Sequence, residues 1–137
     1  MSVEDKLAIL ECLAAYSHTL DNGDDEGWVQ LFTPDAVWES FAAGSDKPSI
    51  HYEGRAGIRE FAAAMRSRSV AQVRHLKINT IFVELTDKIA RIRSNGVLTA
   101  KAPGQPASIA LTGIYAETLH KTPAGWRIAH IALHIDP

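Results

Sequence analysis

The chain has 137 residues, of which 46% are hydrophobic and 22% are charged, and its formal net charge is −2. This composition excludes intrinsic disorder, which combines low hydrophobicity with high net charge. The composition also lacks the excess of lysine and arginine that is typical of proteins that bind nucleic acid. The single cysteine, Cys12, excludes an internal disulfide and a cysteine-based zinc site.

No membrane or secretory segment is evident in the sequence. No apolar run approaches the ~18 residues that a spanning helix needs, and the acidic, polar start has no apolar stretch behind a basic segment. We therefore expect one cytoplasmic domain over residues 1–137, with neither a nucleic acid nor a membrane as partner.

The first third of the chain shows helical periodicity. Apolar residues recur at three- and four-residue steps over residues 7–20, after a capping residue at Ser2 and before a stop signal at Asn22-Gly23. Asp24 is placed to cap a second, short helix that runs through Phe32. A short strand over residues 36–39, a loop over 41–49 and a third helix after Glu53 follow.

After about Val70 the hydrophobic period changes from 3.6 to 2, which predicts strands over residues 73–85, 89–100, 108–120 and 126–135. The connections between them are too short for a helical crossover, so consecutive strands should be antiparallel neighbours. Helices followed by such a meander indicate an α+β fold. Strands this long curl, and we expect a pocket in the concave face of the curled sheet.

His75 is the first candidate for chemistry, because imidazole is the side chain best suited to move a proton near neutral pH. Strand alternation places on its face the residues Lys77, Asn79, Ile81, Val83 and Leu85. A carboxylate partner would fix the tautomer of His75 and stabilise its charged form. The alternative is a partly exposed strand histidine without a chemical role.

Asp21 is the second candidate for chemistry. It ends the first predicted helix, where the helix dipole disfavours a carboxylate by roughly 0.3–1 kcal/mol, so another role should account for it. Asp21 is either an acid or base that faces the pocket or the first residue of an Asx turn at Asp-Asn-Gly. Tyr16, five residues earlier, either packs in the core or lines the same pocket.

Other polar residues stand in apolar surroundings. Glu117 lies in an apolar row of the third long strand and is therefore expected to act as an acid, pair with an arginine or project outward at an edge. His130 and His134 are predicted to share a face with Trp126 and Ile128. No third ligand converges on the two histidines, so we expect no metal site.

Six segments, in this order along the chain, carry a resemblance to a known family: residues 16–24 (YSHTLDNGD), 28–38 (WVQLFTPDAVW), 54–58 (GRAGI), 74–79 (RHLKIN), 113–117 (GIYAE) and 125–130 (GWRIAH). Over nearly its whole length the chain resembles the SnoaL-like group of the nuclear transport factor 2-like (NTF2-like) superfamily. The resemblance implies a cone-shaped α+β barrel, in which three N-terminal helices pack on a strongly curved antiparallel sheet that encloses one pocket.

The resemblance also implies roles for individual residues. Dehydratases and dehydrochlorinases of this group pair an aspartate at the end of the first helix with the strand histidine, which are Asp21 and His75 here. Bile acid 7α-dehydratase-type members add a tyrosine at the position of Tyr16. The second strand histidine of scytalone dehydratase is not matched, because this region reads Arg93-Ser94-Asn95. The residues expected to bind substrate are Trp38, Phe41, Asn95, Tyr115, Glu117 and Ile131.

Together these observations predict a lyase or isomerase of the dehydratase type that needs neither a cofactor nor a metal. His75, polarised by Asp21, would remove a proton from a small apolar carbonyl or hydroxyl compound, and Tyr16 would hydrogen-bond its oxygen. The alternative is a non-catalytic module of the same fold that binds a small ligand or assembles with proteins. A homodimer or homotrimer is expected, because the outward-facing apolar residues of a broad sheet are expected to be buried against another subunit.

Overall fold

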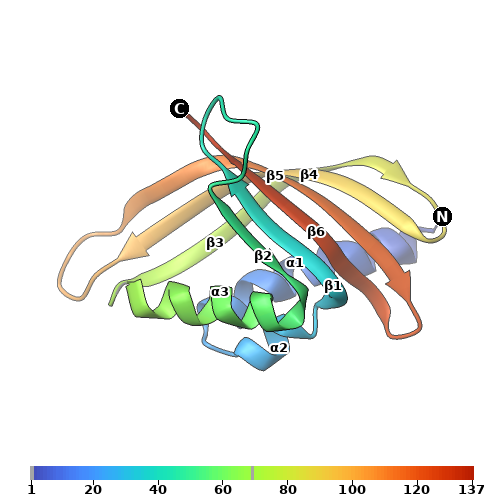
Figure 1. Cartoon of the computed structure of the whole chain (residues 1–137), viewed down its shortest axis with the longest axis horizontal. Coiled ribbons are helices and arrows are strands. Elements are labelled where there is room, and N and C mark those ends of the chain that lie inside the picture. The colour runs from blue at the N-terminus through green and yellow to red at the C-terminus, as the bar shows by residue number, and fades with distance from the viewer. Residues whose placement is uncertain (1, 69) are drawn as a thin grey trace.

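The computed structural model describes residues 2–68 and 70–137, and it places three helices on one side of a single sheet (Figure 1). In chain order the elements are α1 (Val3–Asp21), α2 (Asp25–Val29), β1 (Phe32–Phe41), β2 (Ile50–Glu53), α3 (Gly54–Arg68), β3 (Gln72–Leu85), β4 (Ile89–Lys101), β5 (Ser108–Thr122) and β6 (Gly125–Ile135). The α+β class is confirmed. None of the described helices is long and apolar enough to cross a membrane.

The sheet has six strands in the order β2-β1-β6-β5-β4-β3. Consecutive strands of the meander from β3 to β6 pair antiparallel, as predicted, but β1 pairs parallel with β6. The expectation of a wholly antiparallel sheet is therefore wrong. Parallel pairing needs a long connection, and the chain between β1 and β6 contains β2, α3 and the rest of the meander.

The sheet is also open rather than a closed barrel. Strands β2 and β3 form its two edges and do not pair with each other in the described part of the chain. Helix α3 packs on β1 and β2, and α1 packs on β3 and β6, so the helices cover the concave face that strand pairing leaves open (Figure 1). The enclosed volume is therefore bounded by side chains of α1 and α3 as well as by the sheet.

Helix boundaries largely follow the capping signals. The Ser2 hydroxyl accepts a hydrogen bond from the Asp5 backbone N–H, and Gly23 adopts a φ of 83° just after α1. Helix α2 stops at Val29, earlier than predicted, because Phe32 already pairs with Ile128 in the sheet. The four-residue strand β2 was not predicted, since it is too short to show a period.

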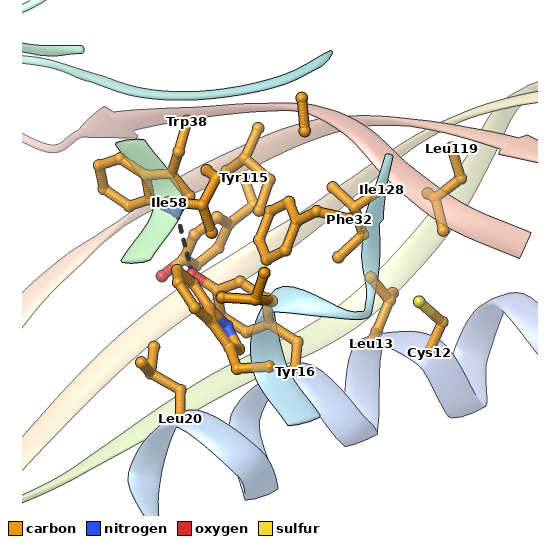
Figure 2. Close-up of a cluster of buried hydrophobic side chains, with 14 of the residues drawn as sticks. Cys12, Leu13, Tyr16, Leu20, Phe32, Trp38, Ile58, Tyr115, Leu119 and Ile128 are labelled. Carbon is orange, nitrogen blue, oxygen red and sulfur yellow. Dashed lines mark hydrogen bonds between the residues drawn. The ribbon is translucent and has the colours of Figure 1, made fainter. Parts of the chain in front are cut away.

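Buried aromatic rings form the centre of the core between the helices and the sheet (Figure 2). The Trp28 ring lies edge-on to Phe32, with centroids 4.8 Å apart, and edge-on to Tyr16 at 5.5 Å. Phe61 of α3 stacks on Trp38 of β1 at a centroid distance of 4.1 Å. This cluster joins all three helices to β1, and it fixes Tyr16 in the middle of the molecule.

A β-bulge interrupts the predicted alternation along β3. Asn79 has a φ of 56°, and the β3–β4 register shifts between Ile78 and Ile81. Residues before the bulge keep the predicted face, but Ile81 and Val83 turn to solvent, where they are 59% and 57% exposed. The extra residue reverses the side chains up to Val83, so the prediction that Asn79, Ile81 and Val83 share a face with His75 is wrong. A second register shift, between Phe82 and Glu84, returns Leu85 to the core side, as predicted.

A second irregularity corrects the prediction for β6. The β5–β6 register shifts between Thr118 and Leu119, so that Trp126 and Ile128 face the core while His130 and His134 lie on the opposite face. The His130 imidazole Nε2 lies 2.7 Å from a Glu39 carboxylate oxygen on that face.

The Asp5 carboxylate anchors the start of α1 to the end of β5 and the start of β6. Lys121 Nζ and Trp126 Nε1 both donate to Asp5 Oδ1, at 2.9 and 2.8 Å. These hydrogen bonds, that from Lys121 first, hold the pKa of Asp5 well below its ordinary value. A carboxyl group with a lowered folded-state pKa stabilises the fold above its unfolded-state pKa of about 3.9, and this contribution is lost as the pH falls further.

We therefore expect Asp5→Asn to lower the free energy of unfolding at pH 7, with the deficit relative to the parent protein shrinking below about pH 4. Urea unfolding measured by circular dichroism between pH 3 and pH 7 checks this. Asp46→Asn, in an exposed loop, is the matched control and should be neutral. A deficit of Asp5→Asn that stays constant across this range would contradict the assignment.

Candidate active site

Asp21 and His75 form a buried, doubly bonded pair. Asp21 is the last residue of α1 and His75 lies near the start of β3. The Asp21 Oδ1 atom lies 2.5 Å from His75 Nδ1, and Oδ2 accepts the His75 backbone N–H at 2.9 Å. The two side chains are 5% and 4% exposed. The unfavourable position of Asp21 at a helix C-terminus is thus accounted for by its partner on β3.

This geometry settles which ring nitrogen of His75 is free. Because a carboxylate accepts but does not donate, Nδ1 carries the proton that it shares with Asp21, and Nε2 of the neutral ring is the unprotonated, basic nitrogen. The Gln72 side-chain amide also donates to the Asp21 backbone carbonyl at 3.0 Å, which fixes the end of α1 against β3.

Tyr16 lies against the pair from the core side. Its ring is edge-on to the His75 ring, with centroids 6.2 Å apart and planes at 84°. The Trp38 indole Nε1–H donates to the Tyr16 hydroxyl oxygen at 3.0 Å (Figure 2). In the described part of the chain no acceptor takes the Tyr16 hydroxyl proton, and Tyr16 is fully buried and does not line the cavity beside His75. Burial raises the pKa of Tyr16 well above its ordinary value, which keeps the phenol protonated.

Behind Tyr16 lies a buried ion pair that the sequence analysis missed. Lys77 Nζ lies 2.5 Å from Glu117 Oε1, and the two side chains are 1% and 0% exposed. Glu117 therefore pairs with a lysine, not with the arginine considered above. Burial lowers the pKa of Lys77, and the charge of Glu117 opposes this effect. The available signal was position, because Lys77 follows His75 by two residues and faces the same side of β3.

A cavity of about 220 Å³, partly open to solvent, adjoins the pair between the end of α1, α3 and the start of β3. Its apolar wall consists of Leu20, Ala62, Met65, Ala71 and Val73, and its polar lining consists of Asp21, His75, Arg66 and Gln72. His75 also lines two hollows between α1 and β3. Ligand pockets commonly measure about 300–1,000 Å³, so a cavity of this size suits a small molecule.

The structure divides the residues expected to bind substrate into two groups. Trp38, Tyr115, Glu117 and Ile131 are buried on the inner face, where Ile131 pairs in register with Trp38 and with Glu117. They lie in the protein interior and are not among the residues that line the 220 Å³ cavity.

Phe41 and Asn95 point the other way, and the expectation that they face the pocket is wrong. Phe41 stacks on His134 at 4.9 Å, and the Asn95 amide donates to Asn79 at 3.1 Å. Phe41 is three residues from Trp38, and Asn95 follows buried Ser94, so alternation places both on the outer face. In residues 2–68 and 70–137 no three His, Cys, Asp or Glu side chains are grouped so as to hold a metal ion.

The fold is similar to solved structures described as having a cystatin-like fold. One is an NTF2-like protein from Novosphingobium aromaticivorans, 22% identical with 97% of this chain and 82% of its own covered and a TM-score of 0.82. Another is a protein of unknown function from Nostoc punctiforme, 20% identical with 100% and 95% covered and a TM-score of 0.85. A sequence profile described as a SnoaL-like domain matches residues 1–132, and the chain therefore belongs to the SnoaL-like family. No curated protein sequence matches the chain.

Solved structures similar to this chain have diverse descriptions. Rv3472 of Mycobacterium tuberculosis, a protein of unknown function, is 30% identical over 98% of this chain and 78% of its own, with a TM-score of 0.84. A putative scytalone dehydratase from N. aromaticivorans is 20% identical, with 98% and 86% covered and a TM-score of 0.80. The β subunit of a putative aromatic-ring-hydroxylating dioxygenase from that organism is 18% identical, with 98% and 90% covered and a TM-score of 0.83.

Proposed function

We propose that this chain is a cofactor-independent lyase or isomerase of the dehydratase type, in which His75 removes a proton from a carbon atom of the substrate. The observation that carries the proposal is the pairing of Asp21 with His75 through two hydrogen bonds, of 2.5 and 2.9 Å, at the edge of a cavity. An isolated strand histidine needs no such partner.

The residues divide the acid–base work between them. His75 Nε2 takes the proton, and Asp21 holds the ring and stabilises the imidazolium that forms. The Tyr16 hydroxyl donates to a substrate oxygen, which is either a carbonyl becoming an enolate or a departing hydroxyl. Trp38 strengthens this donor, because a hydrogen bond to the phenol oxygen stabilises negative charge on it. A base positioned in this way contributes about 10²–10⁴-fold to the rate.

The cavity favours a small, largely apolar carbonyl or hydroxyl compound. Its wall of Leu20, Ala62, Met65 and Val73 offers apolar contacts, while Asp21 and His75 supply its buried polar edge. The chemistry needs no bound cofactor, because side chains alone supply the base and the hydrogen-bond donor. The similarity to a putative scytalone dehydratase supports a reaction of this class.

Exchange of carbon-bound hydrogen tests the proposal without knowledge of the natural substrate. A panel of small cyclic ketones and β-hydroxyketones is incubated with the protein in D₂O, and deuterium incorporation and loss of water are followed by NMR. We expect the parent protein to promote exchange or elimination on at least one compound, and the His75→Gln variant to do neither. Compounds that bind without exchange or elimination would instead indicate a non-catalytic binding protein.

One observation favours the assembly module as second candidate function. Leu76, Ile78, Ile81, Val83 and Ile114 are exposed on the outer face of the sheet, although large apolar side chains gain free energy on burial. We infer self-association through this face as a homodimer or homotrimer.

The expected result is that Ile81→Lys shifts the protein to monomers, because a lysine at this site would be desolvated in the contact. Size-exclusion chromatography with light scattering measures the mass. Lys101→Glu, a charge change at the exposed end of β4, is the control. A parent protein that is monomeric at micromolar concentration would refute the inference.

A further inference from the structure

The mechanism above leaves the buried ion pair of Lys77 and Glu117 unused. The Lys77 ammonium lies 3.4 Å from the centroid of the Tyr16 ring and 4.7 Å from that of the Tyr115 ring, and both distances are well within the range of cation–π attraction. Its side chain is 1% exposed. A charge is costly to bury, so its position over the one phenol that also contacts His75 calls for an explanation.

A cation above a phenol ring does not act equally on the two protonation states of that phenol. Ionisation to phenolate places additional negative charge on the oxygen and ring, and a cation beside the ring attracts the anion more strongly than the neutral phenol. A cation beside the ring also stabilises the partial negative charge that develops on the phenol oxygen when the hydroxyl shares its proton with a substrate oxygen. Burial raises the pKa of Tyr16, as do the nearby Tyr115, Glu117 and Asp21, and a cation over the Tyr16 ring opposes these effects.

Glu117 keeps this cation charged and in place. A buried lysine without a partner favours its neutral form, but Glu117 Oε1 lies 2.5 Å from Lys77 Nζ. Gly96 of β4, the register partner of Lys77, leaves room for this arrangement, because a Cβ atom there would lie 2.5 Å from the Tyr115 ring. The ionisable groups around Tyr16 are thus Asp21, His75, Lys77, Tyr115 and Glu117.

We propose that Lys77, held by Glu117, is a positioning residue that strengthens the Tyr16 hydroxyl as a proton donor. It does not line the 220 Å³ cavity, although it lines one of the hollows between α1 and β3 together with His75, and it acts through the Tyr16 ring. The proposal rests on the proposed function only in naming a substrate oxygen as the acceptor. The acidity of Tyr16 itself is measurable without any substrate.

The test is a fluorine NMR titration of protein labelled with 3,5-difluorotyrosine, whose phenol is more acidic than that of tyrosine, so that ionisation falls in an accessible pH range. Tyr16→Phe assigns the Tyr16 signal. The informative comparison is between the parent protein, in which Glu117 keeps the ammonium charged, and the double variant Lys77→Met/Glu117→Gln, which removes both charges and leaves neither a lone buried lysine nor a lone buried carboxylate. Lys77→Gln/Glu117→Gln replaces the double variant if that variant does not fold.

We expect the Tyr16 titration midpoint to be higher in the double variant than in the parent protein, by about one pH unit or more. Lys121→Met is the matched control, because Lys121 also pairs with a carboxylate and lies beside an aromatic ring, at Trp126, but is remote from Tyr16. It should leave the midpoint unchanged.

Equal midpoints, or a lower midpoint in the double variant, would overturn the proposal. If a compound is turned over, loss of the ammonium should lower kcat more than it changes KM, as expected for a group that acts in the transition state. Absence of turnover on every compound would count against the proposed function alone, since the titration is independent of it.

Discussion

The His75→Ala variant is expected to lose about 10²–10⁴-fold of the turnover of any compound that the parent protein converts. The reason is that Nε2 is the ring nitrogen of His75 that is free to accept a proton, since Nδ1 is directed at Asp21. Asp21→Asn should cost a comparable factor. An amide can no longer stabilise the imidazolium by charge, and its NH₂ group can bind Nδ1 and leave the proton on Nε2.

Two controls distinguish a loss of catalysis from a loss of folding. His75→Gln retains a polar side chain that can bond to Asp21 but contains no group able to act as a base, so it should fold and remain inactive. His120→Ala removes an exposed histidine of β5 and should retain full turnover. Rates are compared at temperatures where circular dichroism shows every variant to be folded. Retained turnover in both His75→Ala and Asp21→Asn would refute the assigned roles.

The fold was predictable wherever local signals and long-range pairing agree. The ends of α1 follow from Ser2 and Gly23, and the four long strands follow from their period. The bulge at Asn79 was not predictable, because the left-handed backbone at one residue costs an asparagine little and leaves the apolar pattern unchanged. Its consequence is large, since it exposes Ile81 and Val83.

The residues of the candidate site were likewise predictable only in part. Asp21 and His75 were each singled out from the sequence, but their pairing was predicted only from the family resemblance, since no local pattern encodes a contact between residues 54 positions apart. Glu117 was recognised as an anomaly, but its partner depends on how β3, β4 and β5 curl around the interior, and Lys77 reaches it from two strands away. Strand alternation could place Lys77 on the inner face. It could not indicate which charge the lysine would meet there.

The largest effect on stability is expected for Trp28→Ala, which should lower the free energy of unfolding by about 3–5 kcal/mol. Trp28 is fully buried, and its ring contacts Tyr16, Phe32 and Phe61, so truncation leaves a cavity that α1, β1 and α3 cannot fill without moving. Since domains are stable by about 5–15 kcal/mol in total, the variant should be only marginally folded. Urea unfolding followed by circular dichroism measures the loss.

Trp28→Phe is the matched comparison, because it retains an aromatic ring and deletes an indole Nε1–H that has no hydrogen-bond partner in the described residues. It should therefore cost clearly less than Trp28→Ala. Because Trp28 also packs against Tyr16, we expect Trp28→Ala to reduce turnover at temperatures where it is still folded. A loss below about 1 kcal/mol for Trp28→Ala would mean that the aromatic cluster does not hold the helices to β1. The rigid placement of Tyr16 beside His75 would then need another source.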